Sequence, residues 1–245
     1  MRDTTRLCLW SGPRNVSTAL MYSFRQRRDT RVLDEPLYGH YLHVSRAEQP
    51  GRDELLKTLD LDAERVVRDV VLGPCNRPVL FMKQMAHHLL GLDRDFLAAT
   101  VNVLLIRDPE QMLPSLVNQV KAPILRDTGL GMQSALLKDL RALGQDPPVL
   151  AAKELLLDPE GVLRELCRRI ELPFEEAMLD WPAGPKPEDG SWAKHWYHNI
   201  HRSTGYMEYK EKTGPFPEKL KPLLDECKPH YDFLYGNAIR AGTRG

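Results

Sequence analysis

Residues 11–18 contain several side chains that can bind an anion, and the backbone N–H groups of the same segment can bind it too. The segment reads Ser-Gly-Pro-Arg-Asn-Val-Ser-Thr and joins a short apolar run to an apolar-periodic stretch, which predicts a strand-to-helix turn. The first turn of a helix presents unpaired N–H groups and the positive end of the helix dipole, which together bind anions. Arg14 adds a permanent cation whose forked geometry suits phosphate or sulfate, and the hydroxyls of Ser17 and Thr18 add donors. A hydroxyl-capped helix with a surface arginine is the alternative interpretation.

A second cation follows the most apolar run of the chain. Arg107 comes directly after residues 101–106, and Ser115 lies eight residues further on, in a stretch that predicts a helix. Ligands of open α/β sheets bind at the carboxyl ends of the strands, so Arg107 is expected to face that crevice. Each residue alone has an ordinary explanation, a salt-bridged strand end for Arg107 and a helix surface position for Ser115. As a pair they can converge on one anion.

The composition excludes several classes of protein. Of 245 residues, 42% are hydrophobic and 28% are charged, which is close to the globular average and argues against disorder and fibrous repeats. The 34 acidic side chains balance 34 basic ones, which argues against a protein that coats nucleic acid by bulk charge. The longest apolar runs, such as Val103–Ile106, fall far short of the about 20 residues that cross a bilayer. We therefore expect a cytoplasmic protein with no nucleic acid and no membrane as partner.

The cysteines and histidines do not indicate a metal or a disulfide framework. The four cysteines, Cys8, Cys75, Cys167 and Cys227, are scattered without a C-x-x-C pair, so we expect free thiols in a reducing compartment. Cys8 is expected in a core strand and Cys167 on the apolar face of a helix. The adjacent pair His87–His88 lacks the i, i+4 spacing of helical metal ligands, and no acidic cluster stands out. No metal site is expected.

Short β-rich runs alternate with longer helical patterns along the chain. This alternation predicts an α/β fold of three layers, with a mostly parallel central sheet flanked by helices. The strands are expected at 6–10, 30–33, 78–83, 101–106 and 148–152, and the helices at 16–26, 85–90, 158–170 and 217–227, with one more from about residue 109. No linker divides the chain, so residues 1–245 are expected to form a single domain.

Residues 181–212 differ from the rest of the chain. They are rich in glycine and proline and contain Trp192, Trp196, Tyr197 and Tyr206. Aromatic side chains at this density are costly to leave in water, so the segment predicts an ordered loop packed over the body of the protein. We interpret its aromatic residues mainly as anchors of this loop.

Three elements of the chain resemble the sulfotransferase family. The turn is similar to the family's 5′-phosphosulfate loop, P-[KR]-S-G-T-T, in whose places stand Pro13, Arg14, Asn15, Val16 (for the glycine), Ser17 and Thr18. A strand that ends in arginine, with a serine eight residues later, holds the 3′-phosphate of the nucleotide in the family, and Arg107 and Ser115 match it. The third element runs from Val149 through Glu154–Glu160 to Leu172-Pro173-Phe174. Together the three elements cover residues 6–176.

The resemblance implies a fold of the P-loop nucleotide-hydrolase type and a transferase activity. The donor would be PAPS, 3′-phosphoadenosine 5′-phosphosulfate, and the acceptor a hydroxyl or amine of a small molecule. The resemblance assigns Arg14 to the leaving group and Lys83, at the end of the third strand, to the sulfuryl group. A lysine that snorkels at a strand edge is the alternative for Lys83. Residues 201–205 stand nearest to the family's C-terminal R-K-G loop, which implies that the nucleotide contacts Arg202, Ser203 and Gly205.

The general base has two candidates. Cytosolic sulfotransferases place a histidine two residues after the lysine, where this chain has Met85, so His87 would need a shifted helix register. Bacterial members resemble this chain in having a glutamate after the second strand, which is Glu35 here. We favour Glu35 and place His87 second. The alternatives are a solvated turn residue for Glu35 and a partly exposed helix position for His87.

Two other functions stay open at this point. An ATP-dependent phosphotransferase would use the same turn, but Val16 and Ser17 replace the Gly-Lys of G-x-x-x-x-G-K-[ST], and no Walker B aspartate for magnesium is evident. The other is a non-catalytic, P-loop-like binding or regulatory domain, which Val16 and Met85 motivate. The sequence indicates neither the identity of the acceptor nor the oligomeric state. Tyr38, Tyr41 and His43 either line an acceptor site or pack a lid helix.

Overall fold

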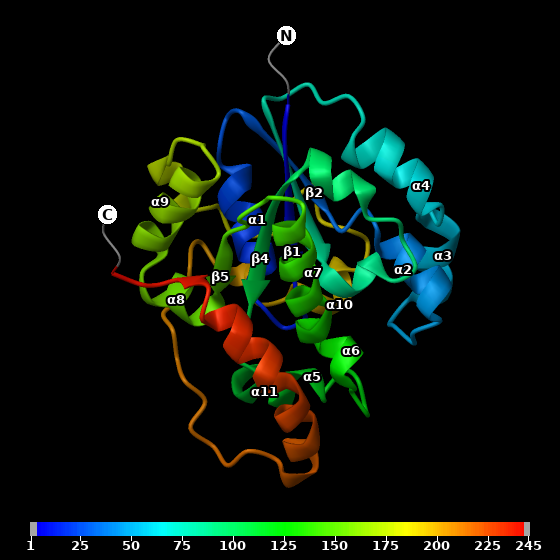
Figure 1. Cartoon of the computed structure of the whole chain (residues 1–245), viewed down its shortest axis with the longest axis vertical. Helices are drawn as coiled ribbons and strands as arrows, with labels where there is room; N and C mark the ends of the chain where they lie inside the picture. Colours follow the sequence, from blue (N-terminus) through cyan, green and yellow to red (C-terminus); the bar gives the residue numbers. More distant parts are fainter. Residues whose placement is uncertain (1–3, 243–245) are drawn as a thin grey trace.

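A parallel β-sheet forms the centre of the molecule (Figure 1). The computed structural model describes residues 4–242, and within them six strands pair in the order β2-β3-β1-β4-β5-β6, each parallel to its neighbours. The strands are β1 (Thr5–Ser11), β2 (Thr30–Asp34), β3 (Val79–Met85), β4 (Val101–Ile106), β5 (Val149–Ala151) and β6 (Ala238–Ile239).

Helices lie between and around the strands. They are α1 (Ser17–Arg25), α2 (Tyr38–Ser45), α3 (Arg52–Thr58), α4 (Ala63–Val66), α5 (Pro109–Leu116), α6 (Leu125–Thr128), α7 (Leu130–Ala142), α8 (Ala152–Leu157), α9 (Pro159–Arg169), α10 (Ala193–Trp196) and α11 (Lys221–Tyr235). Single 3₁₀ turns occur at Ala86–Leu89, Asp95–Ala99, Glu176–Leu179, Ile200–Arg202 and Glu218–Leu220, and a π turn at Val67–Val71.

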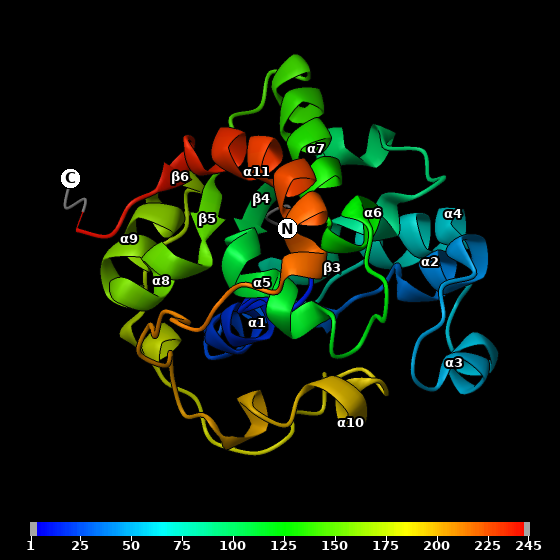
Figure 2. The same cartoon turned by 90° about the horizontal axis from the view of Figure 1, so that it is seen from below.

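The two faces of the sheet belong to separate hydrophobic cores. Along β1, Leu7 and Leu9 pack with α1 and α9 on one face, whereas Cys8 and Trp10 pack with α7 and α11 on the other. All four side chains are buried, as expected for a central parallel strand with helices on both faces. Figure 2 shows α7 and α11 on one side of the sheet and α1 on the other. The predicted three-layer α/β fold with a parallel sheet is confirmed.

Some element boundaries differ from the sequence predictions. The helix expected at 85–90 is a 3₁₀ turn of four residues, because Met85 continues β3 in register with Ser11 of β1. The strand expected at 148–152 ends at Ala151, and the strong helix formers after it start α8 directly. The helix expected at 217–227 begins at Lys221, with Pro222 in its first turn, and extends to Tyr235.

The segment from 181 to 212, which we call the strap, is ordered and packed over the body, as expected from its aromatic residues. Trp181 packs edge-on against Tyr22 of α1, with ring centroids 6.2 Å apart. The Tyr22 hydroxyl donates to the carboxylate of Asp189 at 2.7 Å. Arg25 of α1 forms an ion pair with Glu188 at 2.7 Å. In Figure 2, α10 of the strap lies on the same side of the sheet as α1.

Two further findings concern the whole described chain. Within residues 4–242, no helix is both long and apolar enough to span a bilayer. All four cysteines are free, and Cys8 in β1 and Cys167 in α9 are buried, as predicted.

We predict that Gly12→Ala destabilises the fold. A Cβ atom at Gly12 would lie 2.6 Å from the carbonyl oxygen of Thr128, which is backbone and cannot swing away. Such overpacking costs about 1–3 kcal/mol of the free energy of unfolding, measured by urea denaturation. Gly214→Ala is the matched control, because no atom lies within 4 Å of its added Cβ. Equal stability of the two variants would contradict this prediction.

Candidate functional site

One large cavity opens at the carboxyl ends of the strands. Its volume is about 1140 Å³, and its walls come from the turns after β1, β2, β3, β4 and β5 and from the strap. Open α/β sheets bind their ligands at this edge. Pockets for a drug-sized ligand have volumes of about 300–1,000 Å³, so this cavity lies above the upper end of that range.

Arg14 and Arg107 face this cavity together, from the ends of neighbouring strands β1 and β4. The guanidinium of Arg107 donates to the backbone carbonyl of Arg14, and Arg14 Nε donates to Ser115 Oγ at 2.9 Å. Burial lowers the pKa of both arginines, and the charge of Arg14 lowers that of Arg107 further. Within residues 4–242, neither guanidinium has an ion-pair partner. Two partly buried like charges that form no ion pair favour the binding of an anion between them.

Hydrogen bonds of the Asn15 side chain hold the rest of the turn in place. The Asn15 side-chain amide donates to the carbonyl of Leu105 in β4 at 3.0 Å, and its oxygen accepts from Val16 N at 2.8 Å. Val16 has an ordinary backbone φ of −95° and packs against the core on the α1 side, so this position does not require glycine. Ser17 and Thr18 start α1 and line the cavity, as Pro13 does. Their hydroxyls join the free amides of the first helical turn.

Of the residues proposed for the C-terminal loop, only some reach the cavity. Ser203 and Gly205 line it, but Arg202 is exposed and lies outside it. The Ser203 hydroxyl is already engaged: it accepts from Trp181 Nε1 at 3.1 Å and donates to the carbonyl of Ile200 at 2.9 Å.

A third cation, which the sequence reasoning missed, comes from the end of the strap. Lys212 lines the cavity, and its ammonium donates to the backbone carbonyl of Gln111 in α5 at 2.9 Å. Burial and the charges of Arg107 and Arg14 lower the pKa of Lys212, which places it in the same positive cluster. The sequence feature that could have identified Lys212 is the glycine two residues after it, Gly214. Residues 201–205 were chosen for the R-K-G loop instead, because they contain an arginine before a glycine.

Lys83 lies at the other end of the cavity, in a buried cluster. Its side chain is 2% exposed and donates to Asp34 Oδ1 at 2.8 Å, to Glu35 Oε1 at 2.6 Å and to the hydroxyl of Tyr197. Burial alone would lower the pKa of Lys83, but Asp34 and Glu35 hold it well above its usual value. Burial raises the pKa of Glu35, although Lys83 opposes that shift. The snorkelling alternative for Lys83 is wrong, because its ammonium is inside the protein.

Glu35 occupies a strained backbone position next to this lysine. Its φ is +46°, in the left-handed region that a residue with a Cβ rarely adopts. Its N–H donates to the carbonyl of Lys83 at 2.8 Å, which fixes the turn after β2 against the end of β3. Strain of this kind concentrates at functional sites. The carboxylate is 11% exposed and lines the cavity, so Glu35 is not a solvated turn residue.

The two adjacent histidines have different surroundings. His88 Nε2 lies 3.8 Å from Glu35 Oε2, and its ring stacks on Tyr38 and Tyr41 at centroid distances of 5.2 and 5.0 Å. His87 lines the cavity and packs against Tyr41 at 4.6 Å, but no contact joins it to Glu35. Burial lowers the pKa of His87 to about 4 and that of His88 well below its usual value, so both rings are neutral near pH 7.

Aromatic rings form the wall around this end of the cavity. Tyr38, Tyr41, Trp192 and Trp196 line it, and Tyr38 packs edge-on against Trp192 with ring centroids 5.0 Å apart. Tyr38 and Tyr41 belong to α2 and also line the cavity, so both interpretations given for them apply. His43 does not line this cavity.

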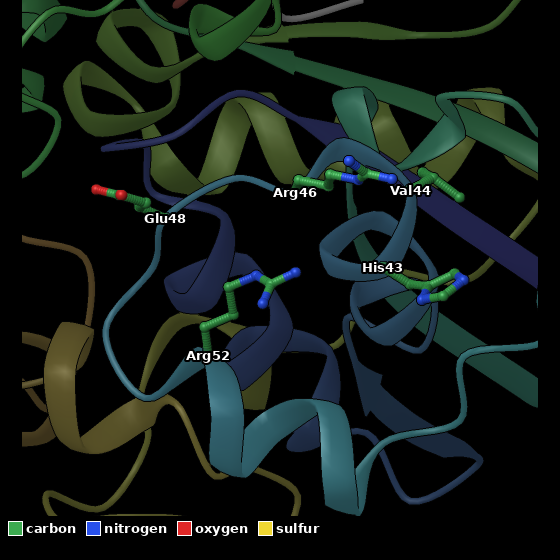
Figure 3. A pocket seen from close by; sticks show the side chains of 5 residues that line it. All are labelled: His43, Val44, Arg46, Glu48 and Arg52. Carbon is green, nitrogen blue, oxygen red and sulfur yellow. The ribbon is translucent and has the colours of Figure 1, made fainter.

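A second hollow lies next to the large cavity and shares Glu48 with it. It has a volume of about 780 Å³ and is lined by His43, Val44, Arg46, Glu48 and Arg52. Figure 3 shows the guanidiniums of Arg46 and Arg52 on either side of it, with the Glu48 side chain directed away. Of the residues considered as functional from the sequence, His43 lies there, away from Tyr38 and Tyr41, which line the large cavity. Within the described residues, moreover, no group of three or more histidine, cysteine or acidic side chains is arranged to hold a metal ion.

Comparisons with known proteins agree with this geometry. The sequence matches the family described as sulfotransferase domain over residues 5–238. Among solved structures, the sulfotransferase domain from the curacin biosynthetic pathway is 14% identical and superposes over 93% of this chain and 99% of its own, with a TM-score of 0.53. A sulfotransferase from Alicyclobacillus acidocaldarius is 13% identical over 96% of this chain and 95% of its own, with a TM-score of 0.54. At these identities the structures show a shared fold.

Two curated relatives from Arabidopsis thaliana carry a different kind of name. Branched-chain-amino-acid aminotransferase-like proteins 2 and 1 are each 41% identical to this chain over 226 residues, which is 92% of it. The match covers 40% of each relative, so this chain spans well under half of their length. The names describe those longer proteins.

We predict that the left-handed backbone of Arg14 stores strain that glycine relieves. Its φ is +54°, which costs a residue with a Cβ roughly 1–2 kcal/mol, partly offset by the greater freedom of glycine in the unfolded chain. Arg14→Gly is therefore expected to be more stable than Arg14→Ala by about 1 kcal/mol in urea denaturation. Both variants lose the same guanidinium and its contact with Ser115, so the difference isolates the backbone. An alanine variant at least as stable as the glycine variant would refute this.

Proposed function

The chain belongs to the sulfotransferase domain family, and on that basis we propose that it transfers a sulfuryl group from PAPS to the hydroxyl or amine of a small-molecule acceptor. One observation carries this proposal: Arg14 and Arg107, from two strand ends, open onto one cavity whose other end holds Lys83 and Glu35. The proposed unit of activity is the whole chain, as a single domain.

The positive end of the cavity fits the nucleotide. The turn after β1 offers amides, the Ser17 and Thr18 hydroxyls and Arg14 to the 5′-phosphosulfate. Arg107 and Ser115, joined by Lys212 from the strap, take the 3′-phosphate. These three cations form no ion pair within residues 4–242, so they are available to the negative charges of such a ligand, and we assign strap residues around Gly205 to the base.

The end of the cavity around Lys83 and Glu35 fits the acceptor. The acceptor oxygen forms a bond to sulfur, while the bond from sulfur to the bridging oxygen of the 5′-phosphate breaks and its electron pair stays on the phosphate. Arg14 stabilises the charge that develops on that leaving oxygen. Glu35 takes the acceptor proton, and Lys83 faces the transferred group. The aromatic wall of Tyr38, Tyr41 and Trp192 suits an acceptor with a planar, apolar body.

We predict that the desulfated nucleotide, adenosine 3′,5′-bisphosphate, binds in calorimetric titration. Arg14→Ala and Arg107→Ala should each weaken binding about ten- to a hundredfold, because each removes charged hydrogen bonds. Arg68→Ala is the matched control, since Arg68 is 67% exposed and forms its ion pair with Asp69, outside the cavity. No binding at millimolar nucleotide would defeat the proposal. Magnesium-dependent binding of ATP instead would favour a phosphotransferase. Binding of the nucleotide without transfer of a sulfuryl group to any acceptor would favour a regulatory domain.

We predict a pH-dependent rate set by Glu35. Because burial raises the pKa of Glu35 above its usual value of 4.5 and a base must be deprotonated, the rate of sulfation of 2-naphthol should rise with pH through a midpoint above that value. Glu35→Gln should lower the rate about 10²–10⁴-fold and remove the acid limb. His87→Gln is the comparison variant. Loss of the acid limb in His87→Gln, with retention in Glu35→Gln, would reassign the base to His87.

A further inference from the structure

The ammonium group of Lys83 has no hydrogen-bond donor left for a ligand. An ammonium group has three N–H donors. In this structure they are directed to Asp34 Oδ1 at 2.8 Å, to Glu35 Oε1 at 2.6 Å and to the hydroxyl oxygen of Tyr197. Lys83 can contact a sulfuryl oxygen only when one of these three partners is released.

Two of the three partners are locked to each other. The Tyr197 hydroxyl has one proton, which it donates to Asp34 Oδ2 at 2.8 Å while its oxygen accepts from Lys83. Asp34 Oδ2 also accepts from the backbone N–H of Gly190 at 3.0 Å. The Asp34 side chain is 1% exposed and does not line the cavity. Releasing either partner would leave a buried polar group unpaired, which is costly.

Glu35 is the partner that can move. It lines the cavity and is the most exposed of the cluster's side chains, and its second oxygen, Oε2, already lies 3.8 Å from His88 Nε2. Several charged or titratable groups face its carboxylate: Lys83 from β3, Asp34 from β2, Tyr38 from α2, His88 from the turn after β3 and Tyr197 from the strap. Lys83 is the one cation among them, since burial keeps His88 neutral.

We propose that Asp34 and Tyr197 are positioning residues that fix two N–H donors of Lys83, so that its third changes partner from Glu35 to a sulfuryl oxygen when PAPS binds. This inference rests on the proposed function. The strap thereby takes part in aiming the lysine, because both Tyr197 and the Gly190 amide come from it. Glu35, released from its cation, becomes more basic at the moment when the donor is in place.

The test compares two nucleotides that differ only in the sulfuryl group, so it needs no acceptor. Calorimetric titration with PAPS and with adenosine 3′,5′-bisphosphate, in buffers of different ionisation enthalpy, gives both affinities and the protons exchanged. Because the 5′-phosphate of the bisphosphate itself titrates near pH 6, the proton count for each nucleotide is compared between the wild-type chain and Glu35→Gln. PAPS binding should take up a larger fraction of a proton near pH 6 in the wild-type chain than in Glu35→Gln, since Glu35 is the group that gains the proton, and bisphosphate binding should show no such difference between the two chains.

Tyr197→Phe is the decisive variant. Phenylalanine keeps the ring, whose centroid lies 5.0 Å from Lys83 Nζ, and removes only the hydroxyl. Bisphosphate affinity should stay within twofold, while the affinity for PAPS relative to the bisphosphate falls about tenfold. Tyr231→Phe, in α11 and outside the cavity, is the matched control, expected to behave as the wild type.

Three outcomes would overturn the inference. Unchanged affinities for both nucleotides in Tyr197→Phe would show that the hydroxyl does not position Lys83. An equal loss of both affinities would show a purely structural role for Tyr197. If the wild-type chain bound neither nucleotide, the proposed function itself would fail and this inference with it.

Discussion

The crowding of cations at one edge of the sheet is the constraint on which the site depends. Arg14 and Arg107 repel each other, and the protein places them together because β1 and β4 are neighbouring strands with both carboxyl ends at that edge. Hydrogen bonds from Arg107 to the Arg14 carbonyl and from Arg14 to Ser115 hold the pair in place. The free energy of folding offsets the repulsion between the two arginines, and binding of a polyanionic ligand would remove that repulsion.

The two ends of the cavity differ in how their charged side chains are paired. At the end proposed for the nucleotide, Arg14, Arg107 and Lys212 form no ion pair within the described residues, so that end attracts anions. At the Lys83 end the buried cation faces two carboxylates, those of Asp34 and Glu35, so that end carries no excess positive charge. A buried charge is tolerated only when it is paired. This division gives one cavity two ligand-binding characters.

The sequence predicted those features that depend on residues close together in the chain. The apolar runs that became β1, β3 and β4 are buried on both faces, and turn residues at their ends, among them Arg14 and Arg107, reach the cavity. The sequence did not indicate the hydrogen bond between Tyr197 and Asp34, 163 positions apart, or the one between Lys212 and Gln111, 101 positions apart. Such pairs form through the path of the strap across α1, which no periodicity encodes. The proximity of His88 rather than His87 to Glu35 likewise follows from a 3₁₀ turn that the pattern interpreted as a helix.

The anchoring of the strap also bears on how long the proposed nucleotide stays bound. One wall of the cavity is the strap itself, fastened to α1 by the Tyr22–Asp189 and Arg25–Glu188 contacts and to β2 through Asp34. A ligand enclosed by such a segment exchanges with solvent no faster than its fastenings open. Because one of them is a surface ion pair that salt screens, residence time and ionic strength are linked.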